Sequence, residues 1–208
     1  MWGWMSDMKP VASVGELLER YAAGQRDFDG INLSRGDLRS ARLWHVRLRQ
    51  ALLCRARLAQ ASLMGGDLSF ADLKFGDLRQ TQLHTAQLAG ADLRFADLRG
   101  ARLWRTCLRG ANLRGSRLEE ALLQGTVLQG ADLRGADLRH VNLRFTNLEG
   151  AFFDQRTRFP PDFDPDWAGM QLSISTSSSG DSGDPSTSVF KRVNGSERSG
   201  QGLELLTP

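Results

Sequence analysis

A leucine recurs at every fifth residue of this chain, without a break from Leu33 to Leu148. The position two residues before each leucine is almost always small, and alanine is its commonest residue. Five residues advance an α-helix by about 500°, which would scatter the leucines around its axis. On a β-strand, an odd period would place successive leucines on opposite faces. The chain must therefore turn once per repeat, so that every leucine points into one shared interior.

The residue before each leucine indicates how many repeats close one coil. It is most often Asp or Asn, but it is arginine at five positions. At a spacing of 20 residues, Arg47, Arg57 and Arg117 each lie between two aspartates, whereas Arg42 and Arg102 do not. Opposite charges on neighbouring strands attract, so the pattern favours four repeats per coil. One repeat cannot bury its own leucine, and the coils must therefore stack into a solenoid.

The motif of a small residue, then Asp or Asn, then Leu resembles that of the pentapeptide repeat proteins, in particular cyanobacterial members. Instances are Ala71-Asp72-Leu73, Ala91-Asp92-Leu93, Ala111-Asn112-Leu113 and Ala131-Asp132-Leu133. The resemblance implies an all-β fold, a right-handed quadrilateral β-helix with four pentapeptides per coil. Residues 26–153 would form about six and a half coils. The leucine and the small residue would face inward and the other three positions outward.

The segments on either side of the repeats predict covers for the open ends of the solenoid. In segment 1–25, Ser13 and Glu16 match a capping box before a helical pattern, which predicts a short capping helix over residues 13–23. Phenylalanine, tryptophan and proline residues in 154–172 predict a capping loop. Residues 173–208 are rich in Ser and Gly, so we expect a disordered tail.

Composition restricts the functional classes. No apolar run is long enough to span a membrane and no secretory signal opens the chain, which predicts a cytoplasmic protein. No nucleophile with a matching base, phosphate-binding loop or metal-ligand cluster is visible. We therefore expect a protein that is not an enzyme and that holds no cofactor or metal. The sequence predicts instead a scaffold that presents a binding surface to another macromolecule, with an unknown protein as the favoured partner.

One outward column, spaced by 20 residues, is a candidate protein interface. It contains Trp44, Met64, His84 and Trp104. Exposed apolar and aromatic side chains in one stripe often mark interfaces. Four further aromatic residues fall at repeat corners, where they either shelter under neighbouring turns or extend this surface; they are Phe70, Phe75, Phe95 and Phe145.

The alternative function is binding of nucleic acid or another anionic surface. Two outward columns supply the candidate anion-binding residues, which are Lys74, Arg79, Arg94, Arg99, Arg114, Arg134 and Arg139. However, Asp and Arg flank the same leucine in six repeats, so these charges can equally pair locally. Both interpretations remain open from the sequence.

Two further expectations follow from the resemblance. Some pentapeptide repeat proteins are similar to duplex DNA in shape and charge and modulate type II topoisomerases. Those proteins have acidic exteriors, whereas residues 26–153 carry 20 basic against 13 acidic groups, so a DNA-mimic role is disfavoured. The aromatic C-terminal end resembles the end through which some relatives form homodimers.

Overall fold

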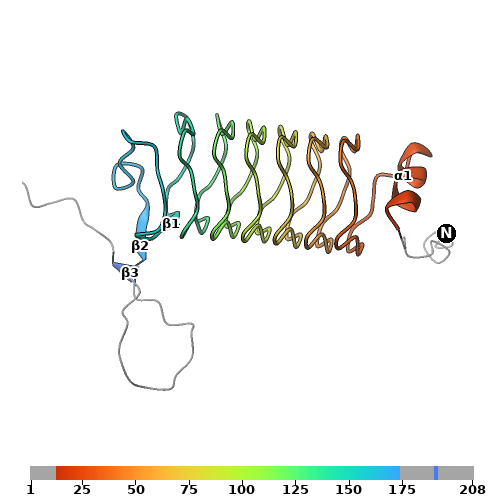
Figure 1. Ribbon diagram of the computed structural model, residues 1–208, viewed down its shortest axis with the longest axis horizontal. Coiled ribbons are helices and arrows are strands. Elements are labelled where there is room, and N and C mark those ends of the chain that lie inside the picture. The colour runs from red at the N-terminus through yellow and green to blue at the C-terminus, as the bar shows by residue number, and fades with distance from the viewer. Residues whose placement is uncertain (1–12, 174–189, 192–208) are drawn as a thin grey trace, which may run out of the picture.

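The computed structural model describes residues 13–173 and the pair 190–191. Within these residues the chain winds into a rod of stacked coils, with helix α1 at one end and a small sheet at the other (Figure 1). No helix among the described residues is long and apolar enough to cross a membrane. Within the same ranges, no group of three or more His, Cys, Asp or Glu side chains could hold a metal ion.

Parallel β-bridges hold the coils together. They join residues 20 apart, from Asp27 and Arg47 at one end to Asp132 and Phe152 near the other. This spacing is four pentapeptides, so each residue lies beside its counterpart in the next coil. The final bridge joins Asp137 to Arg158 at a spacing of 21, because the chain gains one residue after Phe153.

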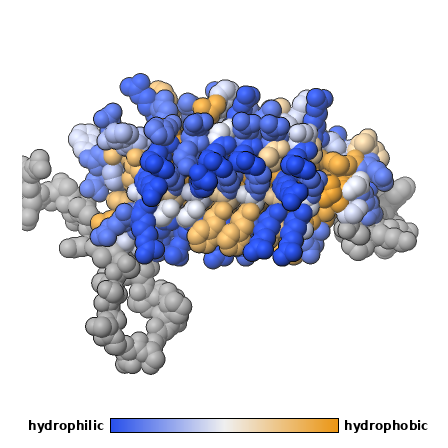
Figure 2. All heavy atoms as spheres, viewed as in Figure 1, coloured by the Kyte–Doolittle hydropathy of each residue, from blue (hydrophilic) through white to orange (hydrophobic). Residues whose placement is uncertain are grey.

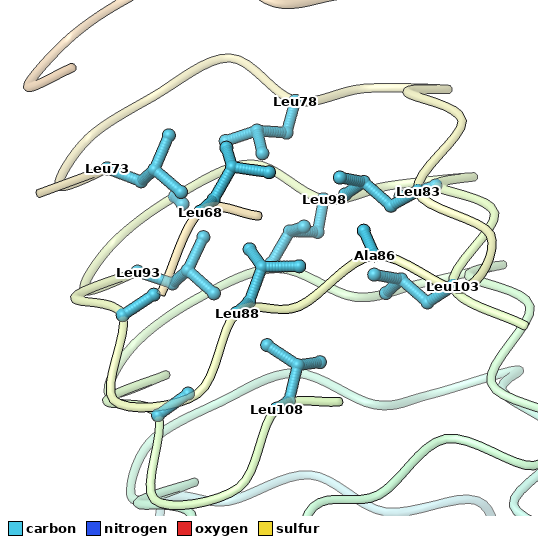
Figure 3. Packing of buried hydrophobic residues seen from close by; sticks show 14 of the residues in the cluster. Leu68, Leu73, Leu78, Leu83, Ala86, Leu88, Leu93, Leu98, Leu103 and Leu108 are labelled. Carbon is cyan, nitrogen blue, oxygen red and sulfur yellow. The ribbon is translucent and has the colours of Figure 1, made fainter. Parts of the chain in front are cut away.

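The leucines fill the interior of the rod. From Leu38 to Leu138, no leucine of the five-residue series is more than 1% exposed. Leucines 20 residues apart stack above one another, as Leu68, Leu88 and Leu108 do in Figure 3. Large and small residues must alternate around such a narrow interior to reach close packing. The inward positions predicted from the repeat are therefore the ones that the fold buries.

Threonine also occurs at the inward small position, where its hydroxyl needs a partner. The Thr106 Oγ1 donates to the Leu83 carbonyl oxygen at 2.7 Å, and the Thr126 Oγ1 donates to the Leu103 carbonyl oxygen at 2.6 Å. Thr157 makes the corresponding bond to the Leu133 carbonyl oxygen at 3.0 Å. Thr157 thus occupies the small position of one more repeat, which continues the pattern past Phe153.

Helix α1, Val14–Ala22, lies at the start of the rod, where the sequence predicts it. The Ser13 Oγ accepts a hydrogen bond from the Glu16 N–H at 3.2 Å, which satisfies one of the free donors at the helix start. Leu17 is fully buried against the first coils. Arg20 forms an ion pair with Glu16 along the helix.

A three-stranded sheet lies at the opposite end. Strand β1, Phe152–Phe153, pairs in parallel with β2, Gln171–Ser173, and β2 pairs antiparallel with β3, Phe190–Lys191. In the loop before β2, Phe159 and Phe163 pack on the core with their ring centroids 5.0 Å apart. Apart from Ser173 and β3, the tail predicted over 173–208 lies outside the described residues.

Candidate functional site

One side of the rod carries the column that the sequence marks as a protein interface. Because the coil has four sides, each side consists of every fourth pentapeptide. We call this side the tryptophan face, and it comprises residues 41–45, 61–65, 81–85, 101–105, 121–125 and 141–145. Its residues include no aspartate and no glutamate. Each of the other three sides of the repeat region carries at least three acidic residues.

The aromatic side chains of the tryptophan face are held in place but remain accessible. Trp44 is 47% exposed and Trp104 is 43% exposed. The Trp44 Nε1 donates to the Ser62 Oγ at 2.8 Å, and Tyr21 of α1 donates to the Trp44 carbonyl oxygen at 3.0 Å. The rings of Trp104 and His84 lie against each other with centroids 4.8 Å apart. The structure therefore places Trp44, His84 and Trp104 on one side, as predicted from their spacing.

His84 is the most enclosed aromatic residue of this column. Its Nε2 is buried and makes no hydrogen bond within the described chain. Burial lowers the pKa of His84, and the positive charge of nearby Arg102 lowers it further. A pKa below the ordinary 6.5 keeps the ring neutral at physiological pH. His84 therefore contributes a flat, uncharged surface beside Trp104.

Four arginines give the tryptophan face a positive charge that nothing nearby balances. Arg42, Arg102, Arg105 and Arg144 form no ion pair with any described residue. The site prediction omitted all four. A signal for two of them was present, because Arg42 and Arg102 are the bridge-position arginines that have no aspartate at a spacing of 20.

The basic columns proposed for anion binding are arranged differently. Six of their seven cations form an ion pair with the aspartate two residues earlier. The pairs are Lys74–Asp72, Arg79–Asp77, Arg94–Asp92, Arg99–Asp97, Arg134–Asp132 and Arg139–Asp137, with nitrogen–oxygen distances of 2.5–3.1 Å. Arg114 follows Asn112 and makes no ion pair with a described residue. Local pairing therefore balances most of the charge in these columns.

The same pairing controls how the rod responds to acid. Hydrogen bonds from the Arg39 guanidinium lower the pKa of Asp37 from 3.8 to about 2. The Arg79 and Arg139 side chains lower the pKa of Asp77 and Asp137 in the same way. A carboxylate whose pKa is lower in the folded state stabilises the fold above its unfolded pKa. That stabilisation is lost as the pH falls through the folded pKa.

We therefore expect the melting temperature to stay level between pH 7 and about pH 5 and to fall between about pH 4 and pH 2. Circular dichroism melts across this range measure the effect. A variant with Asp37→Asn, Asp77→Asn and Asp137→Asn serves as the control, because it lacks three of the titrating groups. It should melt at a lower temperature at pH 7 and lose less on acidification. An identical acid response of the two proteins would contradict this assignment.

Comparison with known proteins agrees with the geometry. A family model of pentapeptide repeats matches the chain in eight copies, over residues 31–69, 45–80, 67–105, 77–115 and 116–155. The chain belongs to the pentapeptide repeat family. Its resemblance to that family is thus confirmed, and the right-handed β-helix predicted from it is the family's fold.

Solved structures of other pentapeptide repeat proteins are similar to the chain. HetL, which is involved in heterocyst differentiation regulation in the cyanobacterium Nostoc sp. strain PCC 7120, is 35% identical over 69% of this chain and 67% of its own, with a TM-score of 0.60. The protein alr5209 of the same cyanobacterium is 30% identical over 79% of this chain and 99% of its own, with a TM-score of 0.31. Rfr23 of Cyanothece 51142 is 28% identical over 68% of this chain and 96% of its own, with a TM-score of 0.34. No curated protein matches the chain.

Proposed function

We propose that this pentapeptide repeat protein is a non-enzymatic scaffold that binds another protein through its tryptophan face. One observation carries the proposal. A single side of the rod combines two half-exposed tryptophans with four arginines that make no ion pair in the described chain, and it contains no acidic residue. Tryptophan and arginine are the residues that contribute most to binding at protein interfaces.

The charge of the tryptophan face indicates the chemistry of the partner. Four guanidinium groups without a counter-charge attract a surface that carries carboxylates, and they repel basic surfaces. Trp44 and Trp104 supply aromatic anchors that are already fixed, which reduces the entropy lost on binding. The partner proposed here is therefore a protein with an acidic surface that also offers apolar side chains to the two tryptophans.

Nucleic-acid binding through the basic columns is the weaker candidate. A phosphate strand along those columns would have to displace the aspartates that already pair with Lys74, Arg94 and Arg134, among others. Exposed ion pairs contribute only about 0–1 kcal/mol each, but their aspartates would also repel phosphate. The local pairing thus favours a protein partner on the tryptophan face.

Affinity capture with matched variants tests the proposal. The full-length chain, a Trp44→Ala/Trp104→Ala variant and a Trp167→Ala variant are each used to capture proteins from an extract of the cells that produce the chain. Trp167 is the control because it is 91% exposed but lies in the C-terminal loop. We expect a protein that is retained by the wild type and by Trp167→Ala, and whose recovery falls at least tenfold with the double variant.

Two results would contradict the proposal. One is the same set of captured proteins for all three forms of the chain, since this would exclude the tryptophan face from binding. The other is a complex that disappears when the extract is treated with nuclease, since this would make nucleic acid the ligand. A parallel capture in high salt should weaken the interaction, because screening reduces the attraction between exposed charges.

A further inference from the structure

A second aromatic surface lies on the side of the rod opposite the tryptophan face. Phe70, Phe75 and Phe95 are 59%, 49% and 57% exposed, and Leu52 on the same side is 43% exposed. We call these four residues the phenylalanine patch. Hydrophobic residues that reach the surface of the rod are surrounded there by hydrophilic ones (Figure 2). One full side, residues 36–40 and their counterparts in later coils, separates this patch from the tryptophan face.

The backbone at these positions does not favour phenylalanine. Phe70, Phe75 and Phe95 are corner residues with φ of 60°, 57° and 57°, in the left-handed region that a bulky side chain rarely adopts. Glycine occupies most of the equivalent corners in the coils that follow, such as Gly110, Gly130 and Gly135. Half-exposed rings also gain only part of the benefit of burial. Residues held in a disfavoured conformation tend to occur where a function requires them.

The rings are fixed in position, and each leaves part of its surface open. A Cβ atom added to Gly90 would lie 2.5 Å from the Phe70 ring, and one added to Gly115 would lie 2.6 Å from the Phe95 ring. Glycine in the next coil thus lets each ring lie flat against the turn. Phe75 stacks on Phe95 with centroids 5.3 Å apart and planes 10° apart. Rings that are already immobilised lose little conformational entropy when a partner covers them.

The charges around the patch select among possible occupants. The Arg55 guanidinium lies over the Phe75 ring, 5.5 Å from its centroid. Arg35, which precedes Arg55 in the same column, and Arg114 make no ion pair with a described residue. On this side, six cations accompany three aspartates, so a second copy of the chain placed patch to patch would meet repulsion.

Nucleic acid fits the same side poorly. Asp72 and Asp92 lie in the bridge column of this side, so a phosphate strand crossing the patch would pass over two carboxylates. An extended protein segment has no such conflict, because it can direct apolar side chains onto the rings and carboxylates toward Arg55 and Arg114.

We propose that the phenylalanine patch is a second protein-docking surface, which takes a peptide segment that combines apolar side chains with acidic ones. The scaffold then holds two partners on opposite sides of one rod. This proposal does not depend on the tryptophan face, because the two surfaces share no residue.

Selection from a library of random 12-residue peptides displayed on phage tests the docking surface. The full-length chain is the target, and the affinities of recovered peptides are measured by fluorescence anisotropy. We expect peptides enriched in Asp or Glu together with Phe, Leu or Trp. Their affinity should fall at least tenfold for the variant Phe70→Asn/Phe75→Asn/Phe95→Asn. Asparagine tolerates the left-handed backbone, so this variant should keep the melting temperature of the wild type.

Two control variants locate the binding. Phe145→Asn removes a corner phenylalanine that is 88% exposed on a different side, and Trp44→Ala/Trp104→Ala alters the tryptophan face; both should retain the affinity for these peptides. The proposal is overturned if no peptide is recovered, if the recovered peptides are basic, or if they bind the triple asparagine variant equally well. Binding of a 20-nucleotide oligothymidylate that depends on the three phenylalanines would also overturn it, in favour of nucleic acid.

Discussion

Replacing Leu93 with lysine is expected to unfold the central coils of the rod. Leu93 is fully buried, in line with Leu73 and Leu113 of the adjacent coils. Its surroundings are leucine and alanine side chains, which offer an ammonium group no partner. An unpaired buried charge costs several kcal/mol, which is comparable with the entire stability of a typical domain, about 5–15 kcal/mol.

The loss should spread beyond one repeat, because each coil of a solenoid is stabilised by its two neighbours. Circular dichroism would show a large drop in melting temperature and in folded signal. Gln87→Lys is the matched control, since it adds the same charge one repeat earlier at an exposed position and should melt like the wild type. If Leu93→Lys melted at the wild-type temperature, the inward assignment of the leucines would be wrong.

A proline at Asp97 is expected to lower the free energy of unfolding by about 3 kcal/mol or more. The Asp97 N–H donates to the Gly76 carbonyl oxygen of the preceding coil at 2.9 Å, and proline has no N–H to give. Asp97 also bridges Asp77 and Arg117 on either side, so the change weakens the ladder at the centre of the rod.

Asp97→Asn isolates the contribution of the backbone bond. Both substitutions remove the carboxylate that pairs with Arg99, but asparagine keeps the N–H. Urea unfolding should show a loss of no more than about 1 kcal/mol for asparagine and a much larger loss for proline. Equal losses for the two variants would contradict the bridge between coils at this position.

The interior of the rod was predictable because its constraint is local and repeated. Each repeat places one leucine and one small residue, and only one direction of the coil can bury them all. The alternation of Arg47 and Arg117 with aspartates at a spacing of 20 predicted which residues lie beside one another. The extra residue before Arg158 was not predicted, because it follows the last recognisable leucine and only the hydrogen bond of Thr157 reveals the continued pattern.

The distribution of charge over the four sides was harder to predict. Both partners of a pair such as Arg99 and Asp97 are visible in the sequence, but their contact depends on the turn that directs both side chains outward. The candidate columns counted cations without subtracting these aspartates. Arg105 and Arg144 of the tryptophan face carried no signal of their own, because a missing partner becomes apparent only when whole sides are compared.

The most direct measurement of the central claim is cross-linking from the tryptophan face inside living cells. A photoreactive p-benzoylphenylalanine placed at Trp104 should form a covalent adduct with a protein on illumination. The same group at Arg139, on a side whose charges are balanced, should form none. An adduct from Trp104 alone is the result that the tryptophan face predicts. Adducts of equal yield from both positions, or none from Trp104, would contradict it.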